Sequence, residues 1–306
     1  MDVPCAYLHA TRGDLPKVYV RLSKEMAQIF TNMCPEYAIC VEDDGSLVVE
    51  VLKGLYGLVE SRYTWYNRLV SLLESLGFVL YENDKCVIKI GDVSLVIYVD
   101  DLLLTGDGEV LNQICDMIEK EFGDCKRNTN KKITFIGMDF EMKNGGVSVK
   151  INLDKIIGTT VGTADTPCPN HVLAISEDAE VLTQDNAEKV HSMMAKLLYI
   201  SKRTRPEISF VINLLCTRVQ SLSVEDVVKL ERVLKYSKGT AEDELFLKIV
   251  EGDDGPVMEV YIDASYGVHA DSKSHSGMLI TMGIGALLAT STKQKCVSPS
   301  QAQRRN

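Results

Sequence analysis

The sequence predicts an α+β fold, and three observations carry that prediction. An apolar ribbon over residues 93–106 is interrupted at its centre by two adjacent carboxylates, which is the pattern of a β-hairpin with a buried sheet behind it. Apolar residues at helical spacing over 60–76 and 109–122 predict two amphipathic helices. Short strand-forming runs after residue 257 predict a separate three-strand meander.

Length and composition are those of an ordinary globular protein. The 306 residues would form one large domain or two to three smaller ones, and the apolar content of 45% provides an ample core. No apolar run reaches the roughly 18 residues that a membrane helix requires, and no basic and apolar leader opens the sequence. These features predict an intracellular protein without a membrane partner, and they do not distinguish cytoplasm from nucleus.

The cysteines and histidines do not form a recognisable metal or disulfide pattern. The nine cysteines are odd in number, scattered and without a Cys-x-x-Cys pair, which indicates reduced thiols. Cys34 with Cys40, and His269 with His275, match no common zinc spacing. The sequence therefore predicts no structural zinc site.

The charge balance is acidic, with a formal net charge of −10. Residues 1–107 alone carry nine Lys and Arg against sixteen Asp and Glu, a net charge of −7. Proteins that bind nucleic acid tightly usually present a basic surface, because phosphate contacts dominate their affinity. The total charge argues against strong nucleic-acid binding unless the basic residues cluster on one face.

The two carboxylates at the centre of the ribbon, Asp100 and Asp101, have two explanations. They could be plain turn residues, a position that Asp favours. Alternatively, adjacent carboxylates in a partly dry place raise the pKa of one of them unless a cation neutralises both, and a divalent metal is the usual cation. The pair alone does not decide between these explanations.

The other expected elements follow in chain order. Strands are expected over 1–8, 15–22, 47–52, 133–142 and 147–151, helices over 186–201, 207–219 and 224–238, and a linker rich in Thr, Gly, Pro, Ala and Asp over 158–183. Basic residues on the three later helices form either a solvated bundle face or a surface that contacts a nucleic-acid backbone: Arg203, Arg205, Lys229, Arg232, Lys235 and Lys238.

Four short motifs follow one another along the chain, and their order is more informative than any one of them. Asp2 is followed five residues later by Tyr7, 52–58 reads Leu-Lys-Gly-Leu-Tyr-Gly-Leu, 98–101 reads Tyr-Val-Asp-Asp, and 261–265 reads Tyr-Ile-Asp-Ala-Ser. Each motif alone is weak. Together, in this order and over essentially the whole chain, they resemble the reverse transcriptase and ribonuclease H region of copia-type (Pseudoviridae-like) retrotransposon polyproteins.

The resemblance implies a particular domain organisation. Residues 1–157 would form a palm-like sheet with helices and a thumb-like part, with the fingers missing. Residues 158–183 would be the linker, 184–252 a helical connection, and 253–306 a truncated ribonuclease H-like piece of three strands. The exposed sheet of that piece would require a covering partner.

The resemblance also implies roles for individual residues. Asp2, Asp100 and Asp101 would hold two Mg²⁺ ions for nucleotidyl transfer, with an RNA or DNA template-primer and a deoxynucleoside triphosphate (dNTP) as partners. Tyr7 would lie against the sugar of the nucleotide. The primer end would be contacted by Tyr98 and Val99, and a first ribonuclease H carboxylate would be supplied by Asp263.

Three departures from the family pattern predict an impaired enzyme. No fingers region precedes Asp2, Glu60 stands where the family usually has Gln, and the tail 298–306 carries Gln where a ribonuclease H Glu is expected. We therefore expect an RNA-directed DNA polymerase fragment that is inactive or impaired. The alternatives are a non-enzymatic retrotransposon remnant that binds nucleic acid or protein, and a polymerase that obtains its fingers from another chain.

Overall fold

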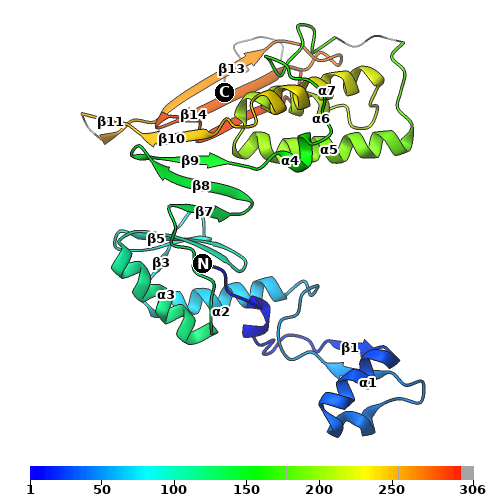
Figure 1. The fold of residues 1–306 in the computed structure, drawn as a ribbon, viewed down its shortest axis with the longest axis vertical. Coiled ribbons are helices and arrows are strands. Elements are labelled where there is room, and N and C mark those ends of the chain that lie inside the picture. The colour runs from blue at the N-terminus through cyan, green and yellow to red at the C-terminus, as the bar shows by residue number, and fades with distance from the viewer. Residues whose placement is uncertain (175, 177, 254, 298–306) are drawn as a thin grey trace. The chain divides into compact units, whose positions relative to one another are not determined.

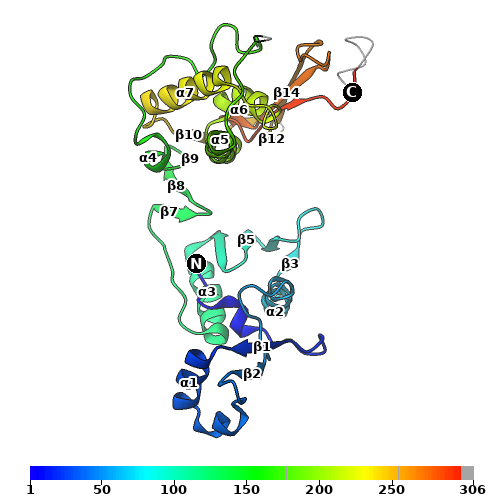
Figure 2. The ribbon, with the colours of Figure 1, turned by 90° about the vertical axis from the view of Figure 1, so that its right-hand side faces the viewer.

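The computed structural model describes residues 1–174, 176, 178–253 and 255–297 (Figures 1 and 2). The chain forms two compact units, Met1–Thr129 and Asn130–Asn306. Within the described residues, no helix combines the length and apolar character needed to cross a membrane.

The first unit contains a four-stranded antiparallel sheet in the order β3-β4-β5-β6 and a separate two-stranded ribbon of β1 and β2. Its elements are η1 (Ala6–His9), β1 (Tyr19–Leu22), α1 (Lys24–Met33), η2 (Pro35–Cys40), β2 (Leu47–Glu50), α2 (Ser61–Ser75), β3 (Val79–Leu80), β4 (Val87–Ile90), β5 (Val93–Tyr98), β6 (Asp101–Thr105) and α3 (Gly108–Phe122).

The core of the first unit lies between the sheet and the helices α2 and α3, which cover the same side of the sheet in Figures 1 and 2. In β5, Val93, Leu95 and Ile97 are buried, as expected for a strand with one face in the core. The buried Trp65 ring of α2 meets the Phe122 ring of α3 edge-on at a centroid distance of 5.0 Å. The hairpin and both helices predicted from periodicity are thus confirmed.

The expectation of a strand over residues 1–8 was wrong. Asp2 forms only isolated bridges, and the chain then turns into the 3₁₀ helix η1. Pro4 has no backbone N–H to extend a ladder, and Cys5 adopts a φ of 55°, which directs the chain away from the sheet.

The second unit contains a five-stranded sheet in the order β15-β10-β9-β8-β7, a three-stranded sheet in the order β13-β14-β16, and a bundle of helices. Its elements are β7 (Lys132–Phe135), β8 (Met138–Lys143), β9 (Gly146–Lys150), α4 (Asp154–Ile157), α5 (Gln184–Arg203), η3 (Pro206–Ile208), α6 (Ser209–Cys216), α7 (Val224–Gly239), β10 (Leu245–Ile249), β11 (Glu251–Gly252), β12 (Gly255–Pro256), β13 (Glu259–Ser265), β14 (His275–Thr281), β15 (Gly283–Ile284) and β16 (Leu288–Lys293).

Two expected elements of the second unit differ from the structure. The single strand expected over 133–142 is a hairpin, because Ile136 and Gly137 both have positive φ (50° and 71°) and form a two-residue turn between β7 and β8. The helix expected over 207–219 begins with a 3₁₀ turn and its α-helical part ends at Cys216.

The division between the units lies at residues 129 and 130, whereas the sequence placed the first boundary at 157. The reason is a long-range pairing: β9 pairs with β10, which joins the β7–β9 strands to the second unit. The meander predicted after residue 257 is present as β13-β14-β16. Tyr261 and Ile262 of β13 are each 56% exposed, so this strand leaves apolar side chains uncovered.

The segment 158–183 is fastened to α7 by basic side chains. Lys229 Nζ donates to Ala174 O (2.6 Å), Arg232 Nε donates to Thr166 O (3.1 Å), and Lys238 Nζ donates to a carbonyl of the same segment. These three cations therefore satisfy backbone carbonyls of the protein itself, rather than forming a plain solvated face.

We predict that Asp226→Ala unfolds the α7 region at a lower denaturant concentration. The Asp226 carboxylate is fully buried, lies 3.1 Å from Arg218 and accepts a hydrogen bond from Ser223 N (3.0 Å). Removing it leaves the guanidinium of Arg218, whose side chain is only 14% exposed, without its partner, which costs about 3–5 kcal/mol. Hydrogen exchange of the α7 amides measures this loss. Glu231→Ala on the exposed face of α7 is the matched control, and equal exchange in the two variants would contradict the prediction.

Candidate active site

The turn that carries the adjacent carboxylates has a strained backbone, and a side chain of α2 holds it in place. Tyr98 and Asp101 pair across a two-residue loop, in which Val99 has a φ of 58°. A β-branched residue in this region costs about 1–3 kcal/mol, so other contacts must hold it there. The indole Nε1 of Trp65 donates to Val99 O at 2.6 Å, which anchors the turn on α2.

Asp2 is brought next to this turn by backbone hydrogen bonds. Val3 N donates to Asp100 O (2.9 Å), and Asp2 pairs with Asp101 as an isolated antiparallel bridge. On its other side Asp2 bridges Lys126, with hydrogen bonds of 2.9 and 3.0 Å between the two backbones.

Directly opposite residues in antiparallel pairs project from the same face. Tyr98, Asp101, Asp2 and Lys126 therefore form one row across the edge of the first unit.

The electrostatics of the row follow from this crowding. Burial raises the pKa of the Asp101 carboxyl above its ordinary value, and the neighbouring charges of Asp100 and Asp2 raise it further. Lys126 Nζ lies 3.7 Å from Asp2 Oδ2, but this lysine is 82% exposed, so the pair contributes little to stability. The row is a negative site with one cation at its end.

A divalent ion fits the donor chemistry of these residues but not the side-chain arrangement in the structure. Carboxylate oxygens are the ligands that Mg²⁺ prefers, and a cation would offset the burial and the like charges that raise the pKa of Asp101. The side-chain arrangement does not match this donor chemistry. Within the described part of the chain, no three Asp, Glu, His or Cys side chains are grouped so that they could hold a metal. Joint coordination by Asp2, Asp100 and Asp101 therefore requires their side chains to rearrange.

Tyr7, which the resemblance placed at the nucleotide sugar, packs against Tyr56. Tyr56 entered the sequence analysis only as part of the 52–58 motif. The Tyr7 and Tyr56 rings lie 4.7 Å apart between centroids. Burial raises the pKa of the Tyr56 hydroxyl, and the charge of Asp100 adds to the shift, which places Tyr56 within the field of the carboxylates. Gly54 permits this packing, because a Cβ there would meet Tyr7 O at 2.5 Å.

Glu60 does not present an unpaired negative charge. Its carboxylate lies 2.9 Å from Nη1 of Arg12, whose side chain is only 5% exposed. A backbone hydrogen bond and the contact with Arg12 lower the pKa of Glu60. Glu60, which stands where the family usually has Gln, is thus paired with the buried side chain of Arg12, a residue that the sequence analysis did not single out.

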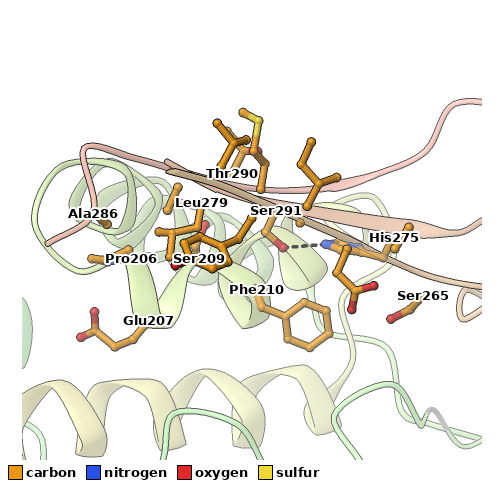
Figure 3. Close-up of a pocket in the computed structure, with 18 residues that line it drawn as sticks. Pro206, Glu207, Ser209, Phe210, Ser265, His275, Leu279, Ala286, Thr290 and Ser291 are labelled. Carbon is orange, nitrogen blue, oxygen red and sulfur yellow. Dashed lines mark hydrogen bonds between the residues drawn. The ribbon is translucent and has the colours of Figure 1, made fainter. Parts of the chain in front are cut away.

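Asp263 lies in the second unit, on the exposed strand β13, and lines a cavity of about 980 Å³ between the three-stranded sheet and α6. Figure 3 shows this cavity and the hydrogen bond of 2.7 Å between His275 Nε2 and Ser291 Oγ. His269 Nε2 lies 3.0 Å from His275 Nδ1. The expected tail with Gln in place of Glu, 298–306, lies outside the described residues.

Comparison with known proteins assigns the chain to a family. Residues 1–169 match the model of the family described as "Reverse transcriptase (RNA-dependent DNA polymerase)". The chain is 24% identical to the Retrovirus-related Pol polyprotein from transposon TNT 1-94 of Nicotiana tabacum, over 99% of this chain and 23% of that protein. It is 28% identical to the corresponding polyprotein from transposon RE1 of Arabidopsis thaliana, over 86% of this chain and 18% of that protein.

A third relative is similar in length. The putative transposon Ty5-1 protein of Saccharomyces cerevisiae is 24% identical over 96% of this chain and 92% of its own length. The chain belongs to the reverse transcriptase family, and its relatives make it a copia-type retrotransposon reverse transcriptase region. It spans about a fifth of the length of the Pol polyproteins from TNT 1-94 and RE1.

We predict that the second unit loses stability as the pH falls from about 6.5 to about 4. Burial lowers the pKa of His275 to about 4, so the unfolded chain, with a pKa near 6.5, binds the proton first. The contribution is fully present above pH 6.5 and amounts to about 3 kcal/mol. Hydrogen exchange of the β14 amides between pH 4 and pH 7 measures it.

The control for this prediction is a second histidine variant. His275→Gln should flatten the pH dependence, whereas His191→Gln, on an exposed part of α5, should leave it as it is. A pH profile that is unchanged in His275→Gln would show that other groups cause the loss.

Proposed function

We propose that the first unit carries RNA-directed DNA synthesis, the transfer of a nucleotidyl group from a dNTP to the 3′-hydroxyl of a primer on a nucleic-acid template. One observation carries the proposal: the bridge between Asp2 and Asp101 joins a distant carboxylate to the Asp100–Asp101 turn. Asp2 lies 98 positions before Asp100 in the sequence, and the bridge places its backbone next to the turn. The three acidic residues together make a negative site suited to metal-assisted phosphoryl transfer.

The residues that would hold the metal are Asp2, Asp100 and Asp101. Two divalent ions, Mg²⁺ by ligand chemistry, would supply a lowered pKa for the primer hydroxyl and charge neutralisation for the leaving pyrophosphate. The raised pKa of Asp101 supports this role, because the site gains by accepting a cation.

The neighbouring residues would position the substrates. Tyr7, braced by Tyr56, would lie against the nucleotide sugar. Tyr98 and Val99 would contact the primer end, where the anchor from Trp65 fixes the turn. These assignments join the roles of the family to the positions that the side chains occupy.

The 306-residue chain alone is expected to extend a primer below the limit of detection. Residues 1–107 carry a net charge of −7, which weakens attraction for template and dNTP. The three carboxylates also have to rearrange before they share an ion. Phosphoryl transfer depends mainly on positioning and charge stabilisation, so both features lower the rate.

We predict that a chimera restores synthesis. Residues 1–169 replace the matching segment of the Pol polyprotein from transposon TNT 1-94, and extension of a DNA primer on an RNA template is measured with Mg²⁺. The chimera should extend the primer, and Asp100→Asn with Asp101→Asn should lower the rate at least about a hundredfold, because metal-assisted charge stabilisation supplies several kcal/mol.

The matched control for the chimera is Asp92→Asn, an exposed carboxylate in the turn before β5. Equal extension by the Asp100 and Asp101 variant, or no extension by a folded chimera, would contradict the proposed function. Extension by the unmodified 306-residue chain, lost in the Asn variant, would support the function and overturn only the expectation of weak activity.

We further propose that Asp263 takes no part in RNA cleavage. Two-metal cleavage shares several acids, and a single exposed carboxylate holds a divalent ion poorly. An RNA–DNA hybrid incubated with the chain and Mg²⁺ should remain intact. Metal-dependent cleavage that disappears in Asp263→Asn would overturn this proposal.

A further inference from the structure

Three polar side chains of the second unit form a hydrogen-bonded relay that the proposed function does not use. Ser291 Oγ lies 2.7 Å from His275 Nε2, and His275 Nδ1 lies 3.0 Å from His269 Nε2. His275 and Ser291 are only 5% and 8% exposed, yet both line the cavity of about 980 Å³ that Figure 3 shows. The relay therefore ends at a cavity wall, with a hydroxyl that a ligand can reach.

The register of the three-stranded sheet places the hydroxyl and the imidazole on one face. Ser291 of β16 lies opposite Gly277 of β14, and His275 lies two residues before Gly277. Because side chains alternate along a strand, His275 and Ser291 project from the same face of the sheet. The Phe210 ring of α6 meets the His275 ring edge-on at a centroid distance of 5.1 Å, so packing also holds the imidazole.

The loop that carries His269 is fastened to the same sheet. Asp271 Oδ2 lies 2.9 Å from Lys293 Nζ of β16, and His269 N donates to Lys273 O at 3.1 Å. The position of His269 is thus set before any ligand arrives. A group that is already ordered loses little conformational freedom when it acts on a neighbour.

The geometry is that of an activated serine. When the Ser291 hydroxyl donates to His275 Nε2, the ring proton of a neutral His275 lies on Nδ1 and is donated to His269 Nε2. A nucleophile within hydrogen-bond reach of a base, with a third group that orients the base, is the arrangement that serves acyl transfer. Burial lowers the pKa of His275 to about 4, so its ring is neutral at pH 7 and able to accept a proton.

A backbone donor accompanies the hydroxyl. Gln294 N donates to Ser274 O at 2.8 Å, and hydrogen-bonded pairs alternate with non-hydrogen-bonded pairs along antiparallel strands. The pair of Gly277 and Ser291 is therefore non-hydrogen-bonded, and Ser291 N–H points away from β14. Since β16 is an edge strand of its sheet within the described residues, this N–H is available to an oxygen that becomes negative.

We propose that the second unit hydrolyses uncharged carboxylic esters, with Ser291 as nucleophile and His275 as general base. His269 is a positioning residue that orients His275. Ser291 Oγ bonds to the acyl carbon as its proton passes to His275 Nε2, and the ester C–O bond breaks as the leaving alcohol takes that proton. Water then attacks the acyl carbon and gives a proton to His275 Nε2. The acid leaves as Ser291 Oγ recovers this proton.

The cavity wall indicates the class of ester. Phe210, Leu279 and Ala289 supply apolar surface, which favours an alkyl or aryl acyl group. Asp263 adds a carboxylate, which repels an anionic ester. Because every residue of the site lies in the second unit, ester hydrolysis is independent of the nucleotidyl transfer proposed for the first unit.

A fluorophosphonate with an alkyl chain tests the site directly, because an activated serine bonds to its phosphorus and releases fluoride. The 306-residue chain is incubated with this probe near neutral pH, and the modified residue is located by mass spectrometry. Ser291 should carry the phosphonyl group, whereas Ser265, an exposed serine that lines the same cavity, should remain unmodified. The uncharged ester 4-nitrophenyl butyrate should be hydrolysed, and prior labelling should stop this hydrolysis.

Variants separate the three roles. Ser291→Ala should abolish labelling, and His275→Gln should lower its rate at least about a hundredfold, the contribution of a general base. His269→Gln keeps an oxygen that accepts from His275 Nδ1–H and should retain most of the rate. His269→Leu removes that acceptor and should lower the rate about tenfold, the loss of one hydrogen bond. Ser265→Ala is the matched control and should be labelled as the original chain is.

Several results would overturn this inference. Hydrogen exchange of the β14 amides shows that each variant is folded, and the folded original chain without label on Ser291 would contradict the proposal. An unchanged labelling rate in His275→Gln, or hydrolysis retained by Ser291→Ala, would do the same. Labelling of Ser291 without hydrolysis of 4-nitrophenyl butyrate would exclude turnover. Equal rates in His269→Leu and His269→Gln would overturn the role of His269.

Discussion

The hydrogen bond from the Trp65 indole to Val99 O is the contact on which the first unit's site depends. Val99 is held at a positive φ that a β-branched residue avoids, so the turn stays in place only because its surroundings fix it. The same turn supplies Asp100 O to Val3 N, and this bond brings Asp2 alongside Asp101. Core packing of α2, turn geometry and the gathering of carboxylates are therefore one connected arrangement.

Periodicity predicted the elements whose burial is local. The hairpin 93–106 and the helices α2 and α3 each bury one face against a shared core, and that pattern is visible in sequence. The expectations that failed depend on single backbone positions or on distant partners. Pro4 and Cys5 prevent the strand expected over residues 1–8, Gly137 contributes to an extra turn, and the pairing of β9 with β10 moves the unit boundary.

The candidate site also divides into residues that the sequence indicates and contacts that only the structure shows. The family motif indicates Asp2, Asp100 and Asp101, but not what surrounds them. Lys126 joins the row through a backbone bridge to Asp2, 124 positions away. Tyr56 and Arg12 gain their roles from contacts with Tyr7 and Glu60. One signal was available in the sequence: Gly54, whose missing side chain permits the close approach to Tyr7 O.

Net charge is a poor guide to this protein because several arginines of the first unit are already paired with carboxylates. Arg12 neutralises Glu60, Arg127 pairs with Asp116 and Glu119, and Arg68 pairs with Glu121.

Cations paired with protein carboxylates offer little to a phosphate, since binding would first have to break those pairs. A nucleic-acid ligand would depend on the cations outside these arginine–carboxylate pairs. Arg62 lines a cavity beside the turn together with Tyr98 and Val99, and the exposed Lys126 lies at the end of the carboxylate row.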